Sequence, residues 1–189
     1  AAVDELVAEG AIAASTPAVV AAQVDVVFTN LPDTPDVEKV VLGEKGIIEG
    51  AHHGLIVIDN STIKPASARM IAEKLAERNV FALDAPVSGG DIGARNGTLT
   101  IMVGGDASAL ERAMPILMAM GKTVTHVGDP GAGRRELAHH TQPLRLDRGK
   151  PWHPPERRMQ LAHGAPDLAH RGVAHLATAF AQQGDHVHV

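Results

Sequence analysis

A regular alternation of apolar runs and amphipathic stretches across the first 133 residues constrains the fold most. The apolar runs, which we predict to be strands, occupy residues 24–29, 55–59, 80–84, 99–103 and 124–127. They are nearly continuous, as expected of strands that are covered on both faces. Helices are predicted between them at 35–42, 65–78 and 108–120, the last capped by Asp106. This rhythm predicts an α/β fold with a mostly parallel sheet flanked by helices.

The composition changes abruptly after Gly133. Residues 134–189 hold 8 of the 11 histidines and 7 of the 11 arginines, but they contain no Ile and only three Val. A sheet needs β-branched residues and a packed helix needs a sustained apolar stripe, so we expect this tail to be irregular or poorly ordered. We therefore divide the chain into a folded domain at 1–133 and an atypical His/Arg/Pro-rich tail at 134–189. The tail is either a genuine extension or the product of a shifted reading frame, and the loss of Ile and Val favours the second.

The bulk composition disfavours several classes of protein. The net charge of −5 argues against nucleic acid as the main partner. No apolar run approaches the roughly 20 residues needed to span a bilayer. The absence of cysteine excludes disulfides and is compatible with the cytoplasm, where we expect the protein to reside. We interpret Arg134-Arg135 as solvated charge and His139-His140 as an adventitious metal binder at most, so no physiological metal site is predicted.

The loop after the third predicted strand is the most specific chemical feature. It reads Asp84-Ala85-Pro86-Val87-Ser88-Gly89-Gly90. Ser88 offers a hydroxyl, and Gly89 and Gly90 offer backbone N–H groups with no side chain in the way. A hydroxyl beside free amides suits a small carboxylate. Taken alone, however, Ser-Gly-Gly is more often a tight turn.

The loops after the first two strands carry weaker signals. In open α/β sheets, ligands bind at the carboxyl ends of the strands, which is where these loops lie. Ser61-Thr62 could bond a ribose or a nicotinamide edge, but alone it is better explained as the start of the helix near Pro65. Leu31-Pro32 could lie against a cofactor, or it could be a plain turn.

Together and in order, these loops resemble the β-hydroxyacid dehydrogenase family, which includes 3-hydroxyisobutyrate dehydrogenase and tartronate semialdehyde reductase. The resemblance runs from about Asp4 to Gly133 and is strongest over 84–105. The stretches 31–38 and 43–46 are closer to the tartronate semialdehyde reductase branch. The resemblance implies a Rossmann-like, dinucleotide-binding domain and a cofactor that is NAD or NADP.

The resemblance also implies roles for individual residues. Leu31 and Pro32 would line the nicotinamide side of the cofactor cleft, and Asp36 falls at a further cofactor contact where the family often has Asn. Ser61 and Thr62 would touch the nicotinamide ribose region. The substrate carboxylate of a small hydroxyacid or semialdehyde would be held by Ser88, Gly89 and Gly90.

Two departures from the family pattern matter. The family opens with a β-α-β unit that carries a Gly-x-Gly-x-x-Gly turn for the pyrophosphate, and this chain starts after that unit. The family also places a catalytic lysine, the general acid, just after the segment matching Gly131-Ala132-Gly133, and Glu136 stands near its place here. The all-helical second domain, which often makes the family's homo-oligomer, is not recognisable, so an oligomer is doubtful for this chain.

The sequence therefore supports three hypotheses. The first is an NAD(P)-dependent oxidoreductase that reduces tartronate semialdehyde to glycerate. The second is a 3-hydroxyisobutyrate dehydrogenase. The third, from another class, is a catalytically inactive fragment of such an enzyme.

Overall fold

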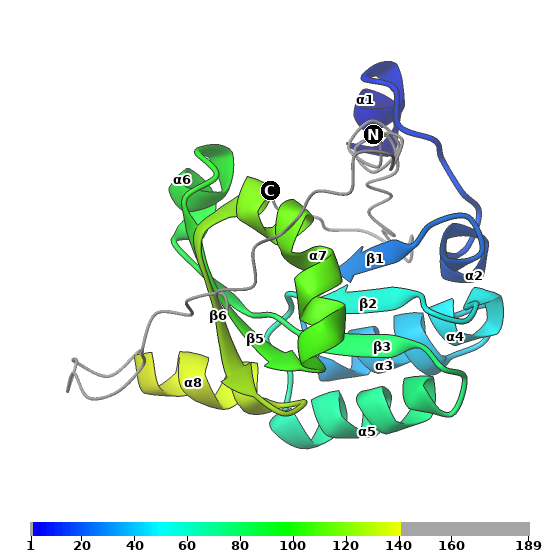
Figure 1. Cartoon of the computed structure of the whole chain (residues 1–189). Helices are drawn as coiled ribbons and strands as arrows, with labels where there is room; N and C mark the ends of the chain where they lie inside the picture. Colours follow the sequence, from blue (N-terminus) through cyan, green and yellow to red (C-terminus); the bar gives the residue numbers. More distant parts are fainter. Residues whose placement is uncertain (1, 141–189) are drawn as a thin grey trace, which may run out of the picture.

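The computed structural model describes residues 2–140, and their strands form one twisted sheet (Figure 1). The strands are β1 (Val26–Thr29), β2 (Ile56–Asp59), β3 (Phe81–Asp84), β4 (Val87–Ser88), β5 (Leu99–Gly105) and β6 (Gly121–Gly128). They are ordered β1-β2-β3-β5-β4, with β6 also paired to β5. The helices are α1 (Ala2–Ala8), α2 (Pro17–Ala21), α3 (Thr34–Leu42), α4 (Ile47–Gly50), α5 (Pro65–Ala76), α6 (Gly90–Arg95), α7 (Ala107–Met120) and α8 (Ala132–His140).

The pairing of the strands confirms a mostly parallel sheet. β1, β2 and β3 are parallel and in register, so Thr29, Asp59 and Asp84 end three neighbouring strands at one edge. β5 runs antiparallel to β3, and β6 runs parallel to β5. The sheet therefore changes direction once between β3 and β5, a reversal that the sequence pattern did not indicate.

The segment after β3 continues the line of that strand. Asp84 is opposite Gly104 on β5, and Ser88 on β4 is opposite Thr100. Because β6 pairs with β5 from Leu99 to Gly104, β3 and β4 must follow one another along the remaining edge. The chain thus runs from the buried strand end outward to Ser88 without folding back.

Helices cover both faces of the sheet, and each face has its own apolar core. The alternation of side chains along β2 divides it between them: Val57 packs with α3 and α5, whereas Ile56 and Ile58 pack with α7. Burying one such aliphatic side chain stabilises the fold by about 1.5–3 kcal/mol. This two-sided covering explains why the strands read as continuous apolar runs.

The long helices begin where their sequence signals lie. The Asp106 carboxylate accepts a hydrogen bond from the Ala109 N–H at 2.9 Å, which confirms Asp106 as the cap of α7. Pro65 occupies the first turn of α5, and Ile71 and Leu75 are buried beneath it, as predicted. The short elements α2, α4, β4 and α6 were not predicted, because each is too short to show a repeating pattern of apolar residues.

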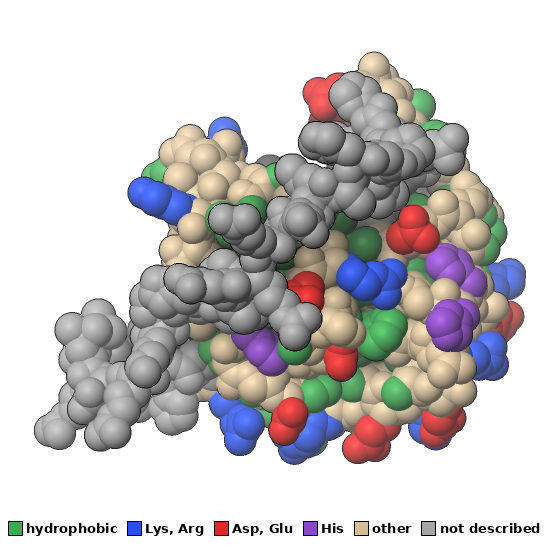
Figure 2. Space-filling view, viewed as in Figure 1, with side chains coloured by type: hydrophobic (Ala, Val, Ile, Leu, Met, Phe, Trp, Pro, Cys, Tyr) green, Lys and Arg blue, Asp and Glu red, His purple; other side chains and the backbone are tan. Residues whose placement is uncertain are grey.

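The domain boundary expected after Gly133 falls inside α8, which continues from Ala132 to His140. Residues 141–189 lie outside the described part of the chain, and so do the expected irregular tail beyond α8 and its two helical windows. On the face in Figure 2, acidic and basic side chains of the described residues are interspersed rather than gathered by sign. In the part of the chain that the structure describes, no helix has the length and apolar character to cross a bilayer.

Candidate functional site

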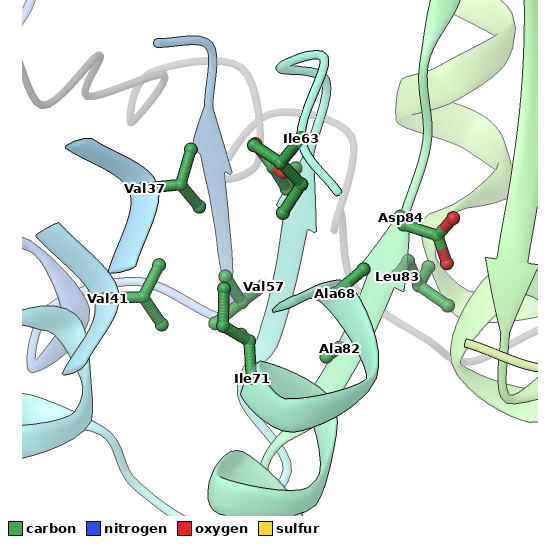
Figure 3. A pocket seen from close by; sticks show the side chains of 10 residues that line it. Val37, Val41, Val57, Ile63, Ala68, Ile71, Ala82, Leu83 and Asp84 are labelled. Carbon is green, nitrogen blue, oxygen red and sulfur yellow. The ribbon is translucent and has the colours of Figure 1, made fainter. Parts of the chain in front are cut away.

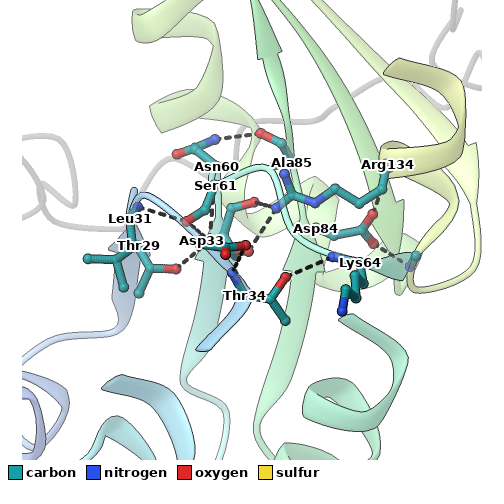
Figure 4. Close-up of polar contacts among 12 residues, drawn as sticks. Thr29, Leu31, Asp33, Thr34, Asn60, Ser61, Lys64, Asp84, Ala85 and Arg134 are labelled. Carbon is teal, nitrogen blue, oxygen red and sulfur yellow. Dashed lines mark hydrogen bonds and ion pairs between the residues drawn. The ribbon is translucent and has the colours of Figure 1, made fainter. Parts of the chain in front are cut away.

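The parallel register brings the loops after β1, β2 and β3 to the same edge of the sheet. Polar residues end all three strands, and Thr29, Asp59 and Asp84 are all buried. Buried polar groups are almost always hydrogen-bonded, so we expect the polar side chains at this edge to have partners. Figure 4 shows Thr29 and Asp84 together with residues of the adjoining loops, among them Asn60 and Ser61.

Asp59 is the centre of the hydrogen-bonded cluster. Its Oδ1 accepts hydrogen bonds from the Thr29 hydroxyl at 2.8 Å and from the Ser61 N–H at 3.1 Å. The Ser61 hydroxyl also donates to this oxygen at 2.5 Å. One carboxylate oxygen therefore ties the end of β1 to the loop after β2.

Leu31 and Ser61, two of the residues predicted to face a cofactor, lie together. The Leu31 N–H donates to the Ser61 hydroxyl oxygen at 2.9 Å. Ser61 is only 2% exposed, so its hydroxyl is used to join the two loops, whereas Thr62 beside it is exposed. The predicted pair thus divides into an inward residue that holds the loops and an outward one that is available to a ligand.

Asn60 adds a third loop to this arrangement. Its side-chain N–H donates to the Ala85 carbonyl at 2.6 Å, which joins the loop after β2 to the segment after β3. The Thr34 hydroxyl accepts from the Lys64 N–H at 3.2 Å, so the start of α3 is joined to the start of α5. All three strand-end loops are therefore fixed relative to one another.

Ser88, Gly89 and Gly90 form a contrasting, exposed group. Ser88 ends β4, and α6 begins at Gly90. Gly89 has φ of 133° and Gly90 has φ of 62°, conformations that residues with a Cβ rarely adopt. The chain bends at Gly89 between β4 and α6, and the three residues are exposed to solvent.

Arg134 is the feature that sequence reasoning misjudged. Far from being solvated, it is 4% exposed, whereas its neighbour Arg135 is exposed. Its Nη2 donates to Oδ2 of Asp59 at 2.8 Å and to the Asp59 carbonyl at 2.7 Å. The expectation failed because a charge read in sequence gives no sign of a buried carboxylate far away in the chain.

Asp84 anchors the start of α8. Its carboxylate accepts hydrogen bonds from the Gly131 N–H at 2.6 Å and from the Arg134 N–H at 3.2 Å. Burial raises the pKa of Asp84, and these two hydrogen bonds and the Arg134 charge oppose the rise. Burial likewise lowers the pKa of the Arg134 guanidinium, against the raising effect of Asp59 and Asp84. Asp59, Asp84 and Arg134 therefore form a buried group of charged side chains that are paired with one another.

The remaining predicted site residues are Pro32, Asp36 and Glu136. Pro32 and Asp36 are exposed, Pro32 in the loop after β1 and Asp36 in the first turn of α3. Glu136 lies in α8, and its side chain is outside the described set. Within residues 2–140, no group of three or more His, Asp or Glu side chains is arranged to hold a metal ion. His139 lies in α8 and its side chain is likewise outside the described set.

A small cavity lies beneath the strand ends (Figure 3). It has a volume of about 20 Å³ and is lined mostly by aliphatic side chains, together with Asp59 and Asp84. A space of this size holds about one water molecule, which excludes it as the site of a dinucleotide.

The comparisons with known proteins agree with this architecture. A model of the NAD binding domain of 6-phosphogluconate dehydrogenase matches residues 1–128. This match covers well over half of the chain and includes all three strand-end loops. The chain belongs to this family of NAD-binding domains, and its predicted Rossmann-like fold is confirmed.

The relatives of known name have several different substrates in their names. The chain is 44% identical over 131 residues to 2-hydroxy-3-oxopropionate reductase of Escherichia coli, which covers 69% of the chain and 45% of that protein. It is 48% identical over 133 residues to NAD-dependent L-serine dehydrogenase of Pseudomonas aeruginosa, with 70% and 45% covered. The crystal structure of 3-hydroxyisobutyrate dehydrogenase from Salmonella typhimurium has a TM-score of 0.67 and 35% identity, with 72% and 48% covered. The resemblance to β-hydroxyacid dehydrogenases is confirmed, and the chain spans about half the length of these relatives.

Proposed function

We propose that this chain is part of an NAD(P)-dependent oxidoreductase of the β-hydroxyacid dehydrogenase type that reduces tartronate semialdehyde (2-hydroxy-3-oxopropionate) to glycerate. The observation that carries the proposal is the meeting of three strand-end loops at one edge of an NAD-binding domain. The choice of substrate is supported by the 44% identity to 2-hydroxy-3-oxopropionate reductase of Escherichia coli.

The loops after β1 and β2 suit a dinucleotide. Leu31 is fixed through Ser61, while Pro32 and Thr62 face solvent beside it. We assign Leu31, Pro32 and Thr62 to direct contact with NAD or NADP, with Asp36 as a further contact. A fixed backbone that presents exposed groups loses little conformational entropy when it binds. When bound, the nicotinamide supplies the hydride.

Ser88, Gly89 and Gly90 suit the substrate carboxylate. A Cβ added at Gly90 would meet nothing within 4 Å, so the backbone there is open to a small ligand. The Ser88 hydroxyl and the neighbouring N–H groups are donors that a carboxylate requires. In this role they would hold the acid by its carboxylate.

One observation favours a second candidate, a domain that binds without turnover. Glu136 occupies the part of α8 where the resemblance places a lysine. A carboxylate cannot stabilise the developing alkoxide or protonate it as an ammonium does. If no other cation of the protein reaches the carbonyl oxygen, this chain is a catalytically inactive member of the family.

The test uses the full chain with NADH or NADPH and tartronate semialdehyde, followed by nicotinamide absorbance. A second arm supplies 3-hydroxyisobutyrate with NAD⁺ or NADP⁺. Turnover of tartronate semialdehyde that is lost in Ser88→Ala but kept in Ser15→Ala, an exposed serine before α2, supports the proposal. Faster turnover of 3-hydroxyisobutyrate would favour that dehydrogenase instead. Cofactor binding without turnover supports the second candidate, and the absence of both overturns the two together.

The coding DNA tests the tail separately. A one-base shift near the codons for residues 133–136, which on correction restores a Lys-x-x-Asn helix, would show that the tail is a frameshift product. An intact frame would show that Glu136 and the residues after it are genuine. The answer determines whether activity assays should use this chain or its corrected form.

A further inference from the structure

Both the backbone and the side chain of Arg134 are hydrogen-bonded to residues at the strand ends. Its backbone N–H donates to Asp84, at the end of β3, and its guanidinium reaches Asp59, at the end of β2 (Figure 4). Its side chain is only 2% exposed. Among residues 2–140 it is the one cation that is buried. Arg134 therefore connects α8 with two parallel strands at the place where their loops begin.

Glycines allow α8 to approach closely enough for this connection. A Cβ at Gly133 would lie 2.5 Å from the Met102 carbonyl oxygen and 2.6 Å from that of Asp84. A Cβ at Gly104 would lie 2.5 Å from the Asp84 carboxylate and 2.9 Å from the Gly133 nitrogen. These contacts are with backbone or with a buried carboxylate, so they cannot be relieved by a small shift of an exposed side chain. The first turn of α8 is thus fixed directly on the strand ends.

The two oxygens of Asp59 face different partners. Oδ2 accepts from Arg134, while Oδ1 accepts from Thr29 and Ser61. Arg134 therefore fixes the rotation of the carboxylate and, with it, the direction in which Oδ1 points. From Oδ1 the hydrogen bonds continue through the Ser61 hydroxyl to the Leu31 N–H.

Stability alone is a weak explanation for this ion pair. Desolvation offsets much of the attraction in a buried pair, so the net gain in stability is small. In addition, Nε and Nη1 of Arg134 are buried without a hydrogen-bond partner in the described chain. The cost of unpaired donors favours a role that depends on the geometry that Arg134 fixes.

We propose that Arg134 is a positioning residue that sets the loops after β1 and β2 for the cofactor by orienting Asp59, which holds Ser61 and Leu31. The expected effect on cofactor binding rests on the proposed function. The coupling itself, the effect of Arg134 through Asp59 on the Ser61–Leu31 hydrogen bond, does not. Loss of Arg134 removes the partner of Oδ2, so the Asp59 carboxylate is free to rotate. This rotation weakens the link between Ser61 and Leu31, although neither of these residues is hydrogen-bonded to Arg134 in the structure.

Amide hydrogen exchange of the ¹⁵N-labelled full chain tests the coupling. In Arg134→Gln, we expect the Leu31 amide to exchange on the order of tenfold faster, the equivalent of about one hydrogen bond. The Phe81 amide, which donates to Leu55 at the opposite end of the sheet, should change little. Arg135→Gln is the matched control, because Arg135 is the exposed neighbour on the same helix, and it should leave both amides unchanged.

Two outcomes would overturn the proposal: an unchanged Leu31 amide, or an increase shared equally by Leu31 and Phe81, which would mark general destabilisation. If Arg134→Gln does not fold, Arg134→Lys gives the same comparison, because lysine keeps the charge but lacks the planar fork of donors. NADH binding, followed by its fluorescence, forms a separate arm. We expect weaker binding in Arg134→Gln than in Arg135→Gln. If the unaltered chain binds no NADH, the proposed function fails, while the exchange data still decide the coupling.

Discussion

The buried cluster at the strand ends and the exposed Ser88–Gly90 loop differ in how they use polar groups. In the cluster, Asp59, Ser61 and Arg134 are buried and their hydrogen bonds go mostly to one another. In the loop, Ser88 and the two glycines are exposed, and the backbone rather than side-chain pairing fixes the shape. The buried cluster therefore suits the positioning of the loops, whereas the exposed loop has donors that remain open to a ligand. Substitutions in the two regions should therefore have different effects on the protein.

The largest expected effect is on stability, from Asp59→Ala. The substitution leaves Arg134 buried without its carboxylate, and breaking one partner of a buried pair costs about 3–5 kcal/mol. Urea unfolding followed by circular dichroism measures the change. The control is Asp91→Ala, an exposed aspartate on α6 in the loop region, which should change the free energy of unfolding by less than about 0.5 kcal/mol. Equal losses in the two variants would remove the distinction between the regions.

A smaller effect is expected from Gly89→Ala in the loop. The φ of 133° is unfavourable for alanine, and a Cβ would lie 3.2 Å from Cδ2 of Leu99. We expect a loss of about 1–3 kcal/mol in the free energy of unfolding. Gly90→Ala should cost less, because its φ of 62° lies in the left-handed helical region, which alanine reaches at about 1–2 kcal/mol. The reverse order, measured by the same urea titrations, would show that the loop does not keep this backbone.

The pH dependence of stability should reveal Asp84. Burial raises its pKa in the folded protein above the unfolded value, so folding favours the protonated form. The stability that this contributes is present below the unfolded pKa and is lost as the pH rises through the folded pKa. Asp84→Asn cannot ionise, so its free energy of unfolding should improve relative to the unaltered chain as the pH rises through that window. A difference between the two proteins that is constant with pH contradicts the assignment.

The smallest effect on stability is expected from Ser88→Ala. Its side chain is exposed at the end of β4, so the free energy of unfolding should change by less than about 0.5 kcal/mol. Binding of the small acid should nevertheless weaken, because the carboxylate loses a donor. Calorimetric titration with tartronate semialdehyde or glycerate checks this, and unchanged binding would remove Ser88 from the site.

The elements whose signals are local could be predicted from the sequence. Asp106 was identified as the cap of α7, and Ile71 and Leu75 as the buried face of α5, because capping and helical spacing involve neighbours in the chain. Leu31, Ser61 and Ser88 could likewise be placed at strand ends. The reversal between β3 and β5 could not be predicted, since the direction in which two strands pair leaves no mark in the apolar pattern of either.

By itself, the sequence determined the family, the alternation of strands and helices, and the loops that carry polar groups, because these depend on short motifs and on periodicity. Only the tertiary structure decided what those groups do. It turned the Ser61 hydroxyl inward to hold Leu31, and it buried Arg134 on Asp59. The physical reason is distance along the chain: Arg134 and Asp59 are separated by 75 residues, and only the packing of α8 on the strand ends makes the solvated-looking charge a buried partner.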